Sequence, residues 1–181
     1  MNLFRTLTPT SGTVDVEAGT ELKVGGLTNL ANVNLNGTGT LAKLTINNHA
    51  TASNSDVVNL NLVGDSSIGE VNVGTNSTLS PTNLNVAPNA TLTKSGPGVL
   101  RPTGTLVNGG TITVAAGKLT VNGIGSGSGS IAVQSGGAIG GSGSIAGTVN
   151  VATGGSVSPH DGTTLATTTF ELLNMWVTPM C

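Results

Sequence analysis

A short motif recurs along the chain and limits the folds that it can adopt. Two aliphatic residues alternate with polar ones, a turn containing Gly or Asn follows, and further aliphatic residues come next. The clearest copies are Val14–Val16, Val71–Val73, Leu84–Val86, Ile112–Val114, Ile131–Val133 and Val149–Val151. Strict alternation places the aliphatic side chains on one face of a short strand. The Gly, Asn, Ser and Pro residues that flank each copy indicate that every strand ends in a turn.

The spacing of the motif is most regular in the C-terminal half of the chain. Val114 and Val133 are 19 positions apart, and Val133 and Val151 are 18 positions apart. Upstream, Val73 and Val86 are 13 positions apart and Val86 and Val114 are 28, which suggests insertions or strands that are not correctly aligned. A coil of about 18–20 residues returns each strand above its predecessor, at about 4.8 Å per rung. The spacing therefore predicts an all-β parallel solenoid, with Gly and Asn at its corners.

The composition agrees with a thin core drawn out along an axis. The chain has 181 residues, of which 36% are hydrophobic but only 8% are charged and 2% aromatic. The net charge is −2, and the six basic residues are too widely spaced for a nucleic-acid interface. No apolar run approaches the length of a membrane-spanning helix, and no signal peptide is visible at the start. The single cysteine, Cys181, makes no internal disulfide or zinc cluster.

Three stretches resemble a known repeat. The segments Gly110–Leu119, Gly136–Val149 and Gly154–Pro159 are similar to the passenger-associated transport repeat of bacterial autotransporter passengers and related surface proteins. The resemblance covers about a third of the chain, within residues 105–159, and the family's usual final Pro-Gly is here Pro159 followed by His160. It implies a right-handed, single-stranded parallel β-helix (a pectin-lyase-like solenoid), export to the cell surface, and a role in adhesion or passenger secretion. It implies no catalytic residue.

Few side chains suggest chemistry. Asp15, Glu17 and Glu21 form the only acidic cluster, and a calcium-dependent polysaccharide lyase on a β-helix would need such a cluster. Asp15 and Glu17 flank inward positions of one strand, so we expect a solvated outer face. His160 and Asp161 are neighbours in a turn, where adjacent side chains rarely face one another, and no serine is spaced as a nucleophile beside them. We therefore predict no catalytic, metal or cofactor site and no enzymatic activity.

Other polar residues have plain interpretations. His49 lies in a corner or an insertion. Thr-x-Thr pairs, which on a flat solenoid can bind ice, are interrupted and irregular in their register; they are Thr91/Thr93, Thr111/Thr113 and, less regularly, Thr38/Thr40. Three glycosylation patterns are expected by chance in a chain of this composition; they begin at Asn36, Asn76 and Asn89.

The two ends differ from the rest of the chain. Phe170–Val177 holds the only Trp and has a spacing that a short amphipathic helix could use. We expect this helix to cap the last rung, although it could instead dock a partner. Residues 1–10, which include Leu3 and Phe4, are a second candidate cap. The predicted organisation is a lead-in or cap at residues 1–12, a solenoid at 13–160 and a cap or tail at 161–181.

Three functions remain open at this point. The first is a secreted or bacterial cell-surface scaffold or adhesin segment, a rigid rod whose outward Asn, Thr and Ser rows make weak, multivalent contacts with surface glycans or other cells. The second is a fibre subunit that self-associates through the solenoid ends. The third is a polysaccharide-active lyase or hydrolase on the same fold.

Overall fold

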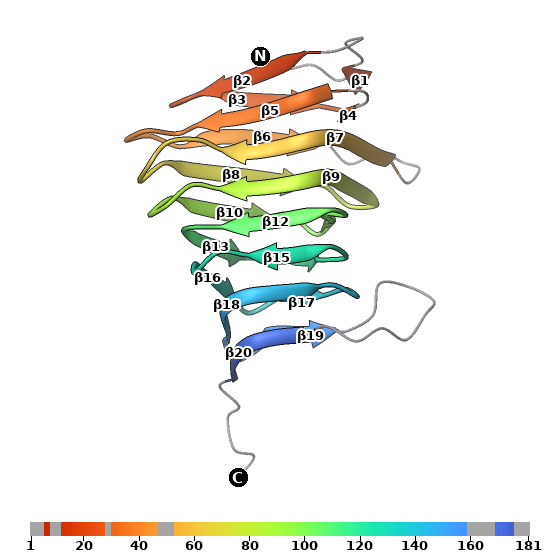
Figure 1. Cartoon of the computed structure of the whole chain (residues 1–181). Coiled ribbons are helices and arrows are strands. Elements are labelled where there is room, and N and C mark those ends of the chain that lie inside the picture. Colours follow the sequence, from red (N-terminus) through yellow and green to blue (C-terminus); the bar gives the residue numbers. More distant parts are fainter. Residues whose placement is uncertain (1–5, 8–11, 28–29, 47–52, 159–168, 176–181) are drawn as a thin grey trace.

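The chain folds as a right-handed parallel β-solenoid. The structure is a computed structural model that describes residues 6–7, 12–27, 30–46, 53–158 and 169–175. No helix occurs among these residues, and every strand pairing among them is parallel. In Figure 1 the front strands run to the left and the strands behind them run to the right as the chain descends, which makes the coil right-handed. The predicted fold class is confirmed.

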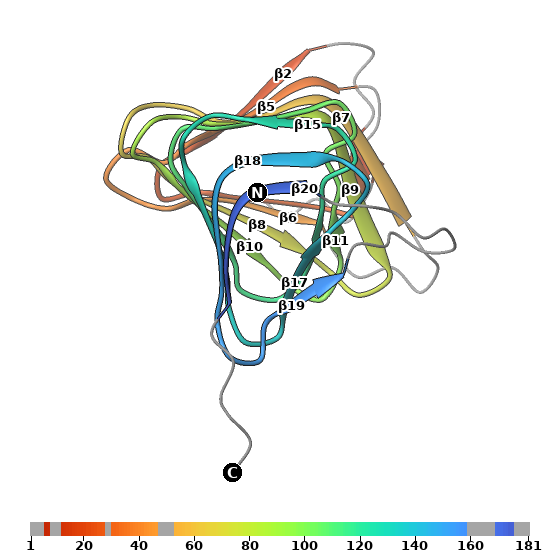
Figure 2. The same ribbon diagram turned by 60° about the horizontal axis from the view of Figure 1, so that its bottom comes forward.

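Each coil passes through three faces, which give the solenoid a roughly triangular outline (Figure 2). Face A contains β2 (Thr13–Glu17), β5 (Leu30–Asn36), the second parts of β7 (Ser53–Leu62) and β9 (Ser77–Val86), β12 (Thr105–Asn108), β15 (Ile124–Ser126), and the starts of β18 (Ser144–Val151) and β20 (Thr169–Met175).

Face B follows face A in every coil. It contains β3 (Glu21–Val24), β6 (Ala42–Ile46), β8 (Ile68–Val73), β10 (Thr91–Ser95), β13 (Thr111–Val114), β16 (Ser130–Val133) and the ends of β18 and β20. Face C contains β1 (Thr6–Leu7) paired with β4 (Gly26–Leu27), the first parts of β7 and β9, β11 (Val99–Leu100), β14 (Gly117–Thr120), β17 (Gly137–Gly140) and β19 (Ser156–Ser158).

The core is a set of aliphatic columns that run along the inside of the faces. On face B, each strand contributes one inward residue to a column that stacks in register. The residues of this column are Leu22, Leu44, Val71, Lys94, Val114, Val133 and Val151. All but Leu22 are at most 2% exposed. Each coil therefore packs its apolar residues against one another and against those of its two neighbouring coils.

The coils are not all of one length. Stacked residues on face A are 27 positions apart for Asn32 and Asn59 and 24 for Asn59 and Asn83. On face B, Thr111 and Ser130 are 19 apart. The predicted period of about 18–20 residues therefore holds for residues 105–158 and, on face A, for the first coil, where Asp15 and Asn34 are 19 positions apart. The coils that carry the Asn59 spacings are longer, and so is the last coil, where the paired Ser144 and Thr169 are 25 positions apart. The expected spacing failed upstream because Val73 and Val86 lie on different faces, B and A, and are not successive rungs.

The predicted cap helix at Phe170–Val177 is wrong for the part that the structure describes. Residues 169–175 form strand β20, which pairs with β18 and extends faces A and B by a further coil. Phe170 lies in register with the buried Ile145, and Leu173 with Val149. Pairing of β20 with β18 thus overrides the helical spacing. Trp176 and Val177 lie outside the described residues.

Corners differ between the two parts of the solenoid. Upstream corners are polar turns, in which Asn76 and Asn89 adopt positive φ (57° and 54°), as the sequence predicts for Asn. Downstream corners contain stacked glycines. A Cβ added at Gly129 would overlap the carbonyl oxygen of Gly110, one coil away. Gly147 meets Gly129 in the same way, so this column admits no side chain.

Candidate functional site

Six asparagines form a flat polar array on face A, which we call the Asn platform. The strands that carry it alternate aliphatic and Asn residues, so that the aliphatic side chains point inward and the amides point outward. The platform has two columns; one is Asn32, Asn59 and Asn83, and the other is Asn34, Asn61 and Asn85. All six residues are half-buried.

The amides of each column are joined by hydrogen bonds. Asn59 Nδ2 donates to Asn32 Oδ1 at 2.9 Å, and Asn83 Nδ2 donates to Asn59 Oδ1 at 2.8 Å. In the other column, Asn61 donates to Asn34 and Asn85 donates to Asn61, both at 2.8 Å. Every one of these bonds points toward the N-terminus. Aligned amides polarise one another, which strengthens a continuous chain of this kind.

The ladders end on oxygen acceptors in the first coil. Asn34 Nδ2 donates to Asp15 Oδ1 at 2.8 Å, and a third, shorter ladder runs from Asn36 to Glu17 Oε1 at 3.1 Å. The remaining column ends where Asn32 donates to Thr13 Oγ1 at 3.1 Å. Asp15 and Glu17 are exposed on strand β2, which confirms their predicted outward position.

The platform can form further hydrogen bonds with a ligand. An amide has two N–H donors and a carbonyl oxygen with two lone pairs. Within the ladder, an interior amide such as Asn59 or Asn61 gives an N–H to the coil before it and accepts one from the coil after it. Asn59 Nδ2 also donates to the backbone oxygen of Ala31 at 3.3 Å, whereas Asn61 Nδ2 makes no second bond to the described residues. One acceptor lone pair of each interior amide, and one N–H of Asn61, therefore remain for solvent or for a polar partner, on rungs about 4.8 Å apart.

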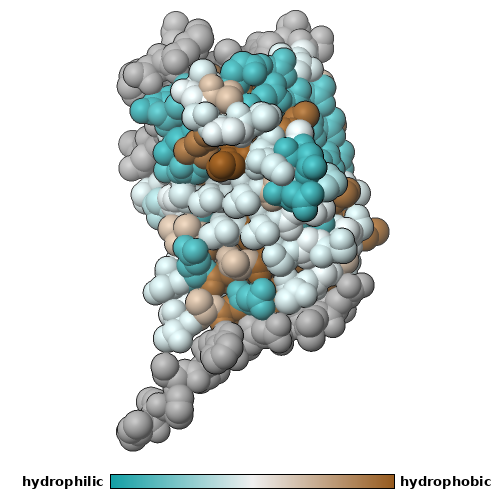
Figure 3. Space-filling model, turned by 90° about the vertical axis from the view of Figure 1, so that its left-hand side faces the viewer, coloured by the Kyte–Doolittle hydropathy of each residue, from teal (hydrophilic) through white to brown (hydrophobic). Residues whose placement is uncertain are grey.

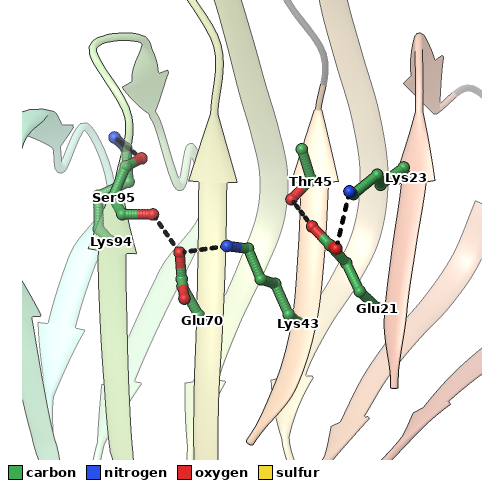
Figure 4. A network of polar contacts seen from close by, with 7 residues as sticks. All are labelled: Glu21, Lys23, Lys43, Thr45, Glu70, Lys94 and Ser95. Atoms are coloured by element: carbon green, nitrogen blue, oxygen red, sulfur yellow. Dashed lines mark hydrogen bonds and ion pairs between the residues drawn. The ribbon is translucent and has the colours of Figure 1, made fainter. Parts of the chain in front are cut away.

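Face B carries a charged row beside the platform (Figure 4). Glu21, Lys43 and Glu70 occupy successive positions of one outward column. Lys43 Nζ lies 3.0 Å from Glu70 Oε1, and the same oxygen accepts a hydrogen bond from Ser95 Oγ at 2.6 Å. Opposite charges on adjacent strands stabilise the sheet modestly.

The carboxyl of Glu21 is the first member of this row. Its Oε2 lies 3.0 Å from Lys23 Nζ, and its Oε1 accepts a hydrogen bond from Thr45 Oγ1 at 2.7 Å. Partial desolvation raises the pKa of Glu21, but the hydrogen bonds from Thr45 and Lys23 and the charges of Lys23 and Lys43 outweigh it, so the net pKa is lowered. An ionised, paired carboxylate of this kind is suited to structural pairing rather than to proton transfer.

Lys94 is the unexpected member of the core. It occupies an inward position between Val71 and Val114 and is fully buried. Its Nζ donates to the carbonyl oxygens of Ser95 and Gly96 at 2.8 Å each, and to that of Ala116 in the next coil at 3.1 Å. Burial lowers the pKa of Lys94 to about 8. The ammonium group thus ties two coils together at the corner between faces B and C.

The threonine rows are short. Thr91 pairs with Thr111 and Thr93 with Thr113, so that a Thr-x-Thr array covers two rungs of face B before Ser130 and Ala132 replace it. The less regular pair Thr38/Thr40 is not on a strand: both residues lie in the exposed turn between β5 and β6. An ice-binding surface would need a longer regular array than the described residues provide.

Several residues singled out in the sequence lie outside the described ranges; they are His49, His160, Asp161 and Cys181. Of the three glycosylation patterns, Asn36 and Asn89 have their side-chain amides bonded to Glu17 and Asp65. Within the described ranges, no three His, Cys, Asp or Glu side chains gather as a metal site. In the same part of the chain, no helix is long and apolar enough to cross a membrane.

At the N-terminal end, no described strand pairs with the outer side of β2 or β3. A groove of about 290 Å³ lies there between the first strands of faces A and B. Apolar and acidic residues line it together; they are Val14, Asp15, Val16, Thr20, Glu21 and Leu22. Val16 and Leu22 belong to the core, so the groove is continuous with the end of the described core rather than a separate cavity.

Comparison with known proteins adds no relative. No protein-family model, curated protein or solved structure matches this chain. That residues 105–159 belong to the passenger-associated transport repeat thus stays a prediction.

Proposed function

We propose that the chain is a non-enzymatic scaffold, a segment of a secreted or bacterial cell-surface adhesin, that presents the Asn platform to surface glycans. The single observation that supports this is the repeated amide array of face A, in which each interior amide keeps an acceptor lone pair and Asn61 also keeps an N–H for a ligand. Sugar hydroxyl groups both donate and accept, and therefore complement such an array. A single contact of this kind is weak, but repetition along a rigid rod raises the avidity.

The surroundings of the platform suit display rather than catalysis. The described carboxylates near it are already paired: Asp15 and Glu17 accept from the ladders, and Glu70 is bound by Lys43. Residues 12–158, which include the whole Asn platform, contain no Phe, Trp or Tyr on which a sugar ring could stack. We therefore expect low affinity for a single sugar and appreciable binding only to dense glycan surfaces.

Glycan binding is tested by a variant of the Asn platform and by a control variant that changes outward residues on another face. The variant replaces Asn59, Asn61, Asn83 and Asn85 by Ala. The control replaces Thr93 and Thr113 by Ala on face B, where the altered positions are again outward. Both proteins and the unaltered chain are coated on beads and applied to a glycan array and to bacterial surfaces, after circular dichroism has shown that each is folded.

The expected result is binding by the unaltered chain and the control, and a loss of about tenfold or more in the platform variant, since several weak contacts are removed together. Equal binding by the platform variant and the unaltered chain would refute the assignment of the Asn platform. Location is tested separately by labelling intact cells of the source organism with an antibody to the chain. Signal only after the cells are broken open would refute surface display.

A further inference from the structure

The two ends of a parallel solenoid are edges at which another chain can pair. Among the described strands, β2 pairs only with β5 and β3 pairs only with β6, so one side of each first strand faces no described strand. Core residues Val16 and Leu22 line the groove beside these two strands. A strand edge without a partner strand recruits further strands unless the chain prevents it.

A second copy of this chain has the right periodicity to add there. The first column of face A begins at Thr13 in β2 and ends at Thr169 in β20, through an unbroken series of parallel pairings. If β20 of one copy lay on β2 of the next, the parallel ladder would simply continue. Such a head-to-tail contact does not close on itself and would produce filaments.

The direction of the side-chain ladders opposes this addition. In each ladder, a residue donates toward the N-terminus and accepts from the C-terminal side. To join a copy placed before it, the first coil would have to donate N–H groups outward. Asp15 and Glu17 occupy those positions, and an ionised carboxylate has no proton to donate.

We propose that Asp15 and Glu17 terminate the ladders and keep a second copy of this chain from adding to the N-terminal edge. Their two roles are chemically linked. As acceptors they stabilise the last amides, Asn34 and Asn36, because charge-assisted hydrogen bonds are the stronger kind. As groups without donors and with negative charge, they leave the edge unable to continue the ladder. The N-terminal edge is therefore a blocked docking surface whose natural occupant would be the chain itself.

The variant Asp15→Asn/Glu17→Gln tests the proposal with little change in shape. Each new amide keeps a carbonyl oxygen for Asn34 or Asn36 and adds an N–H pair that points outward from the edge. The matched control is Asp65→Asn/Glu70→Gln, which removes the same charge from the third coil. Asp65 lies in the turn before β8 and accepts from Asn89, and Glu70 lies within β8, away from both edges.

The unaltered 181-residue chain and the two variants are compared by sedimentation velocity over a wide range of concentrations, with electron microscopy of the same samples. We expect the unaltered chain and the control to remain monomeric, while the weight-average mass of the edge variant rises with concentration by roughly twofold or more and filaments form. Three results would each overturn the proposal. They are a monomeric edge variant, an unaltered chain that already forms filaments, and a control that associates as strongly as the edge variant, since net charge would then explain the effect.

Discussion

The solenoid has two parts that solve the same stacking problem differently. In the broad part, residues 13–95, coils of up to 27 residues are joined across the faces by side-chain ladders, and their corners are polar turns. In the narrow part, residues 105–158, coils of about 19 residues have glycine corners that stack backbone on backbone. Figure 3 shows one side of the surface: hydrophilic residues gather toward the N-terminal end, and residues of intermediate hydropathy, drawn pale, are frequent below them.

The difference teaches how coil length and side-chain chemistry depend on each other. Between Glu70 and Asp161 the sequence contains no Asp or Glu, so the narrow part cannot build carboxylate-terminated ladders. Its stability must come from aliphatic stacking and backbone pairing. The broad part has longer corners with more conformational entropy to lose, and its outward hydrogen bonds offset part of that loss. The two parts should therefore respond to different substitutions.

The largest expected effect comes from a charge in the aliphatic column. Val133→Asp places a carboxylate in the narrow part at a site that is 1% exposed, with Val114 and Val151 above and below it. We expect a loss of more than about 4 kcal/mol in the free energy of unfolding. Val71→Asp in the broad part is the matched variant, and it should cost less because Val71 neighbours Lys94. Urea denaturation measures both losses. Equal losses would contradict the claim that Lys94 stabilises a carboxylate at position 71.

The next largest effect distinguishes the glycine corners of the narrow part from the polar corners of the broad part. Gly129→Ala should destabilise the chain by about 3 kcal/mol, because the new methyl group overlaps the backbone carbonyl of Gly110. In the broad part, Gly39→Asn should cost less than about 1 kcal/mol. Gly39 has φ of 71°, which Asn tolerates, and no atom lies within 4 Å of an added Cβ. Thermal melting compares the two, and a tolerated Gly129→Ala would show that the glycine column is not required for packing.

The third effect lies at the junction of the two parts, where Lys94 reaches Ala116. Burial lowers the pKa of Lys94 from 10.5 to about 8. At pH values between these two, Lys94 therefore binds a proton in the unfolded chain that it releases when the chain folds. The free energy of unfolding should therefore rise with pH across this window, on the order of 2 kcal/mol, because the three carbonyl acceptors retain part of the ammonium form. Chemical denaturation at several pH values measures it. In Lys94→Met the rise should vanish, and a rise of equal size in both proteins would contradict the assignment.

The smallest effect concerns the ladders themselves. Asn61→Ala removes one rung of the platform and leaves Asn34 and Asn85 without their shared partner. We expect a loss of about 1 kcal/mol, because water replaces part of the bonding at a half-buried site. Thr113→Ala on face B should change stability by less than about 0.5 kcal/mol. A platform substitution without any effect on urea denaturation would show that the ladder adds nothing to the broad part.

The alternation of aliphatic and polar residues was sufficient to predict a parallel solenoid and the outward position of Asp15 and Glu17. It also predicted the narrow coils, since Val114, Val133 and Val151 stack in register. The broad coils could not be aligned from spacing because the same motif occurs on two faces, and corners of variable length separate them. Only strand pairing distinguishes a copy on face A from one on face B.

The candidate site was less visible in the sequence. Outward Asn rows were expected, but their alignment depends on coils of 27 and 24 residues that no fixed period would place. The recurring Asn-x-Asn pairs were the available signal. Lys94 could have been found by counting, because it is two residues after the inward Leu92. The strand at Thr169–Met175 was missed because its spacing also fits a helix, and only pairing with β18 decides between the two.

The parallel register of the broad part is the basis of both the platform and the blocked edge, and nuclear magnetic resonance of the labelled protein tests it most directly. The account predicts contacts between the side-chain amide protons of Asn61 and the side chains of Asn34 and Asn85, and between those of Asn83 and Asn59. It also predicts parallel-strand backbone contacts between β7 and β9. Antiparallel contacts between these strands, or Asn61 side-chain protons near neither partner, would contradict the account.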